Sequence, residues 1–280
     1  MSSSDQIREK FRENGYFIAK SIISEKKINA VLETIFRIYF KYNPSSKLRD
    51  LQEPWNSDLF HEELIKFRKS DPKRFSLLYD SSQTSVPLLE LLSEELILKC
   101  SANLLDIKKN ELSIAETMIR MDAPSDKRNV AGWHQEISYL HNNGLVIWIP
   151  LSDITPDLGS LQVCPKSHNE GELEVVQNKN LSSDVSTVSV DEIKPEYIAK
   201  YSKMDIEIKK GDVLFFNTEL FHRSGVNTSN RIRFSCQIRH AINTAEDFVP
   251  FRQTKTYSKS VLDQVIQEHP AFSNNFTPTH

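Results

Sequence analysis

The hydrophobic positions divide the chain into two regions with different periods. Within residues 1–110 the apolar side chains recur mostly at helical spacing, and Ser24 precedes the clearest stretch as a candidate helix cap. A second stretch, residues 86–105, is rich in leucine and has Pro87 near its start, where a helix tolerates proline. The pattern predicts a largely helical first part with long helices in these two places. The apolar residues of the first stretch are Ile28, Val31, Leu32, Ile35, Ile38, Tyr39 and Tyr42.

Beyond Lys108 the pattern changes to short runs rich in β-branched and aromatic residues, separated by turn signals. Six of the seven glycines lie between Gly132 and Gly225, where they suit tight turns between strands. Many short strands at this spacing predict a sandwich or a barrel. The runs cover residues 112–121, 145–151, 161–164, 206–208, 213–216 and 232–238.

No linker or repeat separates the two regions, so we expect one domain over residues 1–280. In that domain a largely helical part, 1–110, packs on a β core, 111–243, which is a barrel or a double-sheet jelly roll. Residues 244–280 are predicted to form a C-terminal extension with one more helix at 259–267. The fold class is therefore mainly β with packed helices.

Composition narrows the function classes. Hydrophobic residues at 39% can form a globular core, and a net charge of −3 argues against nucleic acid or an anionic membrane as the main partner. No apolar run approaches the roughly 20 residues that span a bilayer, and residues 1–5 are too polar for a signal peptide. Cys100, Cys164 and Cys236 are too scattered for a disulfide framework or a zinc site. We expect a cytoplasmic protein that acts on a small molecule, and the sequence leaves its oligomeric state open.

Candidate metal ligands occur as three His-x-Glu pairs: His61/Glu63, His134/Glu136 and His168/Glu170. Residues i and i+2 of a strand point to one face and can bind one ion, but histidine and acidic residues are common enough here for chance pairs. The surroundings must therefore decide between them. The first pair lies in a charged stretch of helical pattern, 59–69, and is predicted to be a solvated helix face.

The pair His168/Glu170 stands between Pro165 and Gly171 and is predicted to be a loop. The pair His134/Glu136 lies inside the β-rich region and is the best candidate. A third ligand must come from a distant strand. His222 is the candidate, because it follows a turn and an apolar strand at residues 211–216.

Together these stretches resemble the phytanoyl-CoA dioxygenase family of iron(II)/2-oxoglutarate oxygenases. The similarity covers roughly residues 5 to 245, and the order and spacing of its pieces are more specific than any single piece. The matching pieces are Asn14-Gly15-Tyr16-Phe17, Trp133-His134-Gln135-Glu136, Leu158-Gly159-Ser160-Leu161-Gln162-Val163-Cys164-Pro165-Lys166-Ser167-His168, Gly211-Asp212-Val213-Leu214-Phe215-Phe216, His222-Arg223-Ser224-Gly225-Val226-Asn227 and Arg233.

The resemblance implies a double-stranded β-helix that binds Fe(II), with 2-oxoglutarate and O2 as co-substrates. It assigns the metal to His134, Glu136 and His222. Such a set of two imidazoles and one carboxylate leaves open coordination positions, which suits iron oxygenases. The expected reaction is hydroxylation of a small organic substrate with release of succinate and CO2.

The resemblance also assigns co-substrate residues. Arg233 and Ser224 would hold the distal carboxylate of 2-oxoglutarate, because a guanidinium forms paired hydrogen bonds with a carboxylate. Met118 and Trp148 would line the co-substrate pocket, although tryptophan is also a common packing residue. One departure concerns the metal site, where this chain has Glu136 and the family usually has aspartate.

The segment 231–239 alternates between polar and apolar residues. Arg231, Arg233, Ser235, Gln237 and Arg239 share one predicted face, and Ile232, Phe234, Cys236 and Ile238 share the other. The polar face could meet solvent or the inside of a ligand-holding barrel, and the resemblance favours the inside.

Two other functions stay open: a barrel that has lost catalysis and only binds a metal or a small ligand, and a metal-dependent isomerase or lyase. Arg233 with Ser224 separates them from a 2-oxoglutarate enzyme, since only that enzyme needs the pair. Long polar loops in compact domains are often covers, so residues 169–203 are predicted to be a mobile lid, with a helix-bearing insertion as the alternative.

Overall fold

The computed structural model describes residues 3–126, 130–136, 144–173, 175–176, 192–246 and 248. The helices are α1 (Ser3–Asn14), α2 (Glu25–Tyr42), α3 (Asp58–Ser70), α4 (Pro72–Gln83), α5 (Val86–Leu92), α6 (Glu95–Leu105) and α8 (Pro195–Ile198), with short 3-10 turns at Lys47–Asp50, Pro54–Asn56, Lys109–Glu111 and Ser167–Glu170. The strands are β1 (Tyr16–Ala19), β2 (Leu112–Asp122), β3 (Gly144–Pro150), β4 (Leu161–Val163), β5 (Val175–Val176), β6 (Glu192–Ile193), β7 (Met204–Asp205), β8 (Val213–Asn217), β9 (His222–Ser224) and β10 (Arg233–Ile242).

The helical first part follows the predicted period. Ser24 occupies the N-cap position of α2 with extended backbone, and the face with Ile28, Leu32 and Ile35 is buried. The single helix expected over residues 86–105 is wrong. The chain leaves the helix at Ser93 and turns through extended Glu94, so α5 and α6 are separate. The turn brings Ile97 and Leu104 of α6 into the same core as the leucines of α5.

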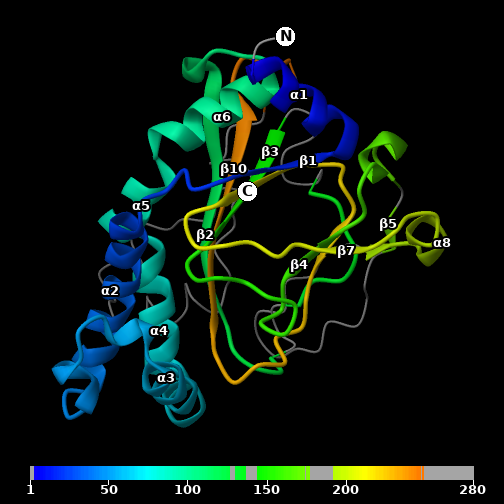
Figure 1. Cartoon of the computed structure of the whole chain (residues 1–280). Coiled ribbons are helices and arrows are strands. Elements are labelled where there is room, and N and C mark those ends of the chain that lie inside the picture. The colour runs from blue at the N-terminus through cyan, green and yellow to red at the C-terminus, as the bar shows by residue number, and fades with distance from the viewer. Residues whose placement is uncertain are drawn as a thin grey trace, which may run out of the picture.

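Two antiparallel sheets form the core of the described chain, and β5 and β6 form a separate two-stranded sheet. The major sheet has the order β1-β8-β3-β10-β2, and the minor sheet has the order β7-β4-β9. Figure 1 shows α2, α3 and α4 on one side of the long strands β2 and β10, with β4 and β7 on the other side. This is the predicted jelly-roll arrangement with helices packed on its outer face.

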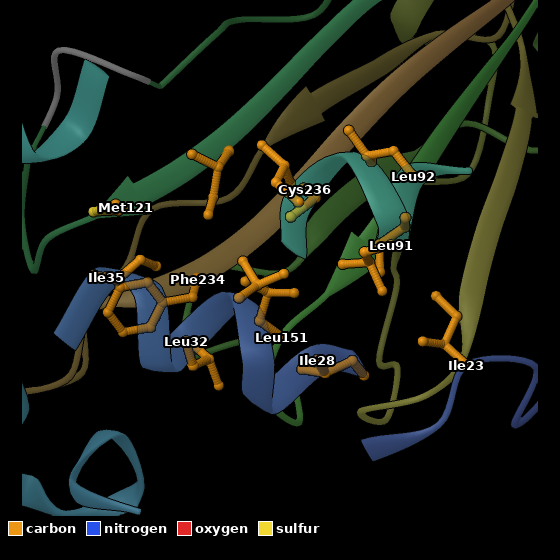
Figure 2. Packing of buried hydrophobic residues seen from close by; sticks show 14 of the residues in the cluster. Ile23, Ile28, Leu32, Ile35, Leu91, Leu92, Met121, Leu151, Phe234 and Cys236 are labelled. Atoms are coloured by element: carbon orange, nitrogen blue, oxygen red, sulfur yellow. The ribbon is translucent and has the colours of Figure 1, made fainter. Parts of the chain in front are cut away.

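The two faces of the major sheet differ in chemistry. On β3, Leu145, Ile147 and Ile149 pack toward the helices, while Val146 and Trp148 belong to a second apolar cluster that includes residues of β4. Figure 2 shows the outer packing, in which side chains of α2 and α5 meet Phe234 and Cys236 of β10. Two of the intervening residues of β10 have partners on the opposite face of the sheet: Arg239 binds Glu136, and Arg233 binds Asp122, which also holds Arg120 next to Ser224 of β9. The prediction that the polar face points into the barrel is therefore confirmed at Arg233 and Arg239.

Some sequence predictions need correction, and others concern residues that the structure does not describe. The strand expected at residues 206–208 is displaced: β7 is Met204–Asp205, and Ile208 forms only an isolated bridge with Ile154. The expected helix at 259–267 and the middle of the expected lid at 169–203 lie outside the described residues. Among the described helices, none combines the length and apolar character needed to cross a bilayer.

Candidate metal centre

The three candidate ligands lie on two segments that pair with each other. His134 forms an isolated antiparallel bridge with His222, the first residue of β9. The N–H of each residue donates to the C=O of the other, at 2.9 and 3.1 Å. The N–H of Glu136 donates to the C=O of Thr218 at 2.7 Å. Main-chain bonds between distant parts of the sequence thus bring the three residues together, although residues 134–136 form a bridge and not a full strand.

The other end of β9 is held close to β4. Gly225 follows β9, and its N–H donates to the C=O of Ser160 at 3.0 Å. A Cβ at position 225 would lie 2.2 Å from that same oxygen, so only glycine allows this approach. The close contact fixes Ser224 beside β4, opposite Leu161.

The side chains of the three residues converge in a buried place. The Nε2 atoms of His134 and His222 lie 3.7 and 3.5 Å from Oε1 of Glu136, and all three ligand atoms lie within 4.8 Å of one another. The exposed fractions are 5% for His134, 2% for Glu136 and 2% for His222. Ligands about 2.1 Å from one ion and at right angles lie about 3 Å apart, so a small closure would complete a coordination site.

The hydrogen bonds of the two rings determine which nitrogen carries the proton. Nδ1 of His134 lies 2.8 Å from the C=O of Gly132, and Nδ1 of His222 lies 2.9 Å from the C=O of Leu220. A carbonyl only accepts, so each Nδ1 donates, and whenever the ring is neutral the lone pair of Nε2 faces Glu136. Burial and the neighbouring His134 lower the pKa of His222, which favours its neutral form. Two lone pairs facing a carboxylate oxygen repel each other unless a cation lies between them, so these residues fit a divalent metal ion.

Glu136 has a second partner, which comes from the major sheet. Arg239 of β10 donates from Nε to Oε2 and from Nη2 to Oε1 of Glu136, both at 2.9 Å. Burial alone would raise the pKa of Glu136, but Arg239 and the two histidines outweigh it and hold this pKa well below its usual range. The carboxylate is therefore ionised, as a metal ligand must be.

A second charged cluster lies beside Ser224. Arg233 of β10 donates from Nε and Nη2 to Oδ2 of Asp122, at 3.1 and 2.7 Å. Arg120 of β2 donates from Nη2 to Oδ1 of Asp122 at 3.1 Å and from Nη1 to Oγ of Ser224 at 3.4 Å. All four residues are buried. Burial would raise the pKa of Asp122, but the two guanidiniums outweigh it and hold this pKa below its usual range.

The remaining predicted co-substrate residues lie between these two clusters. Met118 of β2 and Trp148 of β3 both stand opposite Gln237 of β10, on its two sides. Trp148 is buried in the apolar cluster between the sheets, whereas Met118 is only partly buried. The row of Met118, Gln237 and Trp148 therefore crosses the inner face of the major sheet between Arg233 and Arg239.

Arg231 does not share the inner face with Arg233, and that expectation is wrong. The strand begins only at Arg233, because Asn227 and Ser229 hold the main chain of Arg231 in a loop. Its guanidinium bonds Asp58 of α3 at 2.8 Å on the outer side. Arg231 thus lies away from the candidate site.

The first rejected histidine pair also differs from expectation. His61 was predicted to lie on a solvated helix face, but it is buried, and its Nδ1 accepts the N–H of Ile232 at 3.0 Å. Glu63 points elsewhere and accepts hydrogen bonds from Tyr39 and Ser46. The pair does not converge on one ion, because residues i and i+2 of a helix diverge.

The second rejected pair also has other partners. His168 lies in a short 3-10 turn, where its Nε2 lies 2.9 Å from the C=O of Arg12. Glu170 accepts hydrogen bonds from Tyr201 and Lys200. Cys164 and Cys236 are buried and unpaired, as expected of small apolar groups.

Comparison with known proteins agrees with this geometry. The phytanoyl-CoA dioxygenase domain-containing protein 1 homolog of Dictyostelium discoideum is 33% identical over 107 residues, which cover 36% of each chain. Among solved structures, the epimerase SnoN in complex with Fe3+, alpha ketoglutarate and nogalamycin RO matches with a TM-score of 0.56 and 12% identity, over 85% of this chain and 83% of that one. EvdO2 from Micromonospora carbonacea var. aurantiaca, complexed with 2-oxoglutarate, matches with a TM-score of 0.54 and 16% identity, over 89% and 94%.

At these identities the solved structures show a shared fold. The family assignment has a separate basis, since the family model for phytanoyl-CoA dioxygenase (PhyH) matches residues 11–235. Because that model spans most of the sequence, the chain belongs to the phytanoyl-CoA dioxygenase family, whose members are iron- and 2-oxoglutarate-dependent oxygenases.

Proposed function

We propose that the protein is an Fe(II)/2-oxoglutarate-dependent dioxygenase that hydroxylates a small organic substrate. In this reaction one oxygen atom of O2 enters the substrate and the other enters succinate, and CO2 is released. The observation that carries the proposal is the convergence of His134, Glu136 and His222 in a buried place, with both Nε2 lone pairs directed at one carboxylate oxygen.

These three residues would hold the iron. Two neutral imidazoles and one carboxylate occupy half of an octahedral shell and leave the remaining positions to co-substrate and O2. Bound iron supplies the oxidising chemistry, and the chain positions its partners. The burial of all three side chains limits the access of bulk water to the site.

Arg233 and Ser224 would hold the distal carboxylate of 2-oxoglutarate. Ser224 lies two residues beyond His222 on β9, so their Cα atoms are about 6–7 Å apart. The residues at this end suit an anion: Arg120 and Arg233 both bind the carboxylate of Asp122, and Arg120 also donates to Ser224, so two guanidiniums lie together beside Ser224.

Met118 and Trp148 would line the space between the two ends of the co-substrate. Both flank Gln237 on the inner face, in the row between Arg233 and Arg239. An apolar wall at this place suits the methylene groups of 2-oxoglutarate, while the charged groups at its two ends fix its orientation.

The test is anaerobic addition of Fe(II) and then 2-oxoglutarate to the purified protein. We expect a weak visible charge-transfer band that needs both additions and is absent in His222→Ala. A substrate screen in air should then show succinate formation that rises with one compound. Absence of the band and of succinate in the wild-type protein would contradict the proposal and favour a barrel without oxygenase turnover.

A further inference from the structure

We propose that Arg239 is the positioning residue that makes Glu136 a suitable metal ligand in this chain. The inference rests on the proposed metal site and adds a residue to it. Arg239 comes from β10 of the major sheet. Among the three ligands, His222 begins β9 of the minor sheet, and His134 and Glu136 lie on the segment that is bridged to it. Its paired hydrogen bonds to Glu136 therefore connect the two sheets across the metal centre.

The contacts of the two carboxylate oxygens differ. Oε1 of Glu136 accepts one hydrogen bond from Nη2 of Arg239 and faces Nε2 of both histidines at 3.7 and 3.5 Å. Oε2 accepts the hydrogen bond from Nε of Arg239 and also lies 2.9 Å from its Nη2. A guanidinium bound through two parallel hydrogen bonds fixes the plane of a carboxylate as well as its place. Arg239 thus aims Oε1 at the two imidazoles and holds Oε2 away from them.

This arrangement also accounts for the length of the ligand side chain. Glutamate extends about 1.5 Å further than aspartate, because it has one more carbon–carbon bond. Its extra torsion would let the carboxylate rotate among several positions around an ion. The guanidinium of Arg239 removes that freedom, and a shorter side chain at position 136 would draw the carboxylate back from the guanidinium. We infer that Glu136 and Arg239 are a matched pair.

Arg239 has two opposed effects on a bound cation. Its positive charge repels the ion, whereas its hydrogen bonds prepare the geometry of the ligand. Replacement by lysine separates these effects, because lysine keeps the charge but offers no planar pair of donors. Replacements of groups that orient a metal ligand typically lower metal affinity by 10–100-fold.

The experiment titrates Co(II) into the metal-free protein and follows its visible absorption, without turnover. Arg239→Lys should weaken Co(II) binding at least about tenfold and change the shape or intensity of the band, since the freed carboxylate can rotate. Arg231→Lys is the matched control, because the same change is made at a half-exposed arginine on the outer side of the sheet. Its affinity and spectrum should equal those of the wild type.

A double-mutant cycle with Glu136→Asp completes the test. Glu136→Asp alone should lose at least about tenfold in affinity, and Arg239→Lys added to it should cost less than about threefold, because the hydrogen bonds are already lost. Circular dichroism of each metal-free variant checks that it is folded. If Arg239→Lys does not fold, the affinity of Glu136→Asp still decides.

Wild-type affinity and spectrum in Arg239→Lys, or in Glu136→Asp, would overturn the inference. Additive losses in the cycle would also overturn it. A wild-type protein that binds no Co(II) would instead contradict the proposed metal site itself, so the two failures can be distinguished.

Discussion

Two buried arginine–carboxylate contacts of the described residues involve β10, and they differ in what surrounds the carboxylate. At the metal centre Arg239 binds Glu136 through both carboxylate oxygens, and Glu136 also faces the two histidines. Beside Ser224 two guanidiniums, Arg120 and Arg233, bind the carboxylate of Asp122. The first carboxylate faces the proposed place of a cation, whereas the second joins two guanidiniums at the proposed place of an anion.

This difference indicates different tasks for similar residues. A guanidinium bound to a carboxylate in a place of low dielectric fixes its geometry and leaves the carboxylate ionised for a cation. Two guanidiniums held side by side by Asp122 can both donate to a further anion, as the distal carboxylate of 2-oxoglutarate would be. One strand, β10, supplies an arginine to each group, so the same alternation positions both ends of the proposed site.

The strongest test of the metal end removes the ligands. His134→Ala and His222→Ala should each abolish Fe(II) binding, because each removes one of only three protein ligands. Glu136→Ala should weaken binding and stop turnover, and it also leaves the charge of Arg239 without this carboxylate. Anaerobic titration with Fe(II) measures all three. Wild-type turnover of 2-oxoglutarate in the three variants would show that the assigned site is wrong.

The next largest effect concerns the guanidinium of Arg233 beside Ser224. Loss of one partner of a buried charged pair costs about 2–5 kcal/mol, which is on the order of 30-fold to several thousand-fold in affinity. Arg233→Met should therefore raise the dissociation constant for 2-oxoglutarate at least tens-fold while Fe(II) still binds. Arg233→Lys should recover part of the loss. Titration of 2-oxoglutarate against the Fe(II)-loaded variants gives the answer, and unchanged affinity in Arg233→Met would exclude it as the distal contact.

The sequence indicated which residues gather at the candidate site better than it indicated the hydrogen bonds between them. The order and spacing of the matching pieces indicated His134, Glu136, His222 and Arg233, because the family pattern is local and ordered. The alternation of β10 placed Arg239 on the same face as Arg233. It did not predict a bond to Glu136, since that residue is 103 positions away and joins the site through a bridge.

The errors have equally local causes. Arg231 fits the alternation, but Asn227 and Ser229 bind its main chain in a loop before the strand begins. His61 looked solvated in a charged helix, yet the N–H of Ile232 binds its ring from the neighbouring strand end. Arg120 and Asp122 were missed because the sequence does not give the register of β2 against β10, which sets Asp122 opposite Arg233. The polar positions of β2 could have drawn attention to them, since they alternate with buried Ile119 and Met121.

Replacement of Asp122 tests the charge argument by removing the carboxylate and not a guanidinium. Asp122→Asn removes the shared negative charge and leaves two buried guanidiniums facing each other, so the unfolding free energy should fall by about 3 kcal/mol. Added 2-oxoglutarate should stabilise this variant more than the wild type, because its carboxylate replaces the lost charge. Thermal unfolding with and without 2-oxoglutarate measures both effects. Equal stabilisation of the two proteins would mean that the co-substrate does not bind at this cluster.

The smallest effect on 2-oxoglutarate binding is expected at Arg231, because its side chain lies on the outer side of the sheet and not on the inner one. Arg231→Met should leave the 2-oxoglutarate affinity within about twofold, because Arg231 bonds Asp58 and not the barrel interior. The substitution should instead change the stability of the protein through His61. Burial first, and the charge of Arg231 second, lower the pKa of His61 from 6.5 to about 4.

The direction of the resulting pH dependence follows from proton binding. Between pH 6.5 and 4 the unfolded chain protonates His61 and the folded chain does not, so stability is lost as the pH falls through this window. Removal of Arg231 raises the folded pKa of His61 toward 6.5, and less stability is then lost. Relative to the wild type, the variant should gain less than about 1 kcal/mol of unfolding free energy at pH 4 compared with pH 7, because Arg231 is partly exposed and screened by solvent. Urea unfolding of both proteins across pH 4–7 measures it. A steeper acid loss in the variant would contradict the charge effect of Arg231 on His61, and a large loss of 2-oxoglutarate affinity would show that Arg231 acts at the inner face.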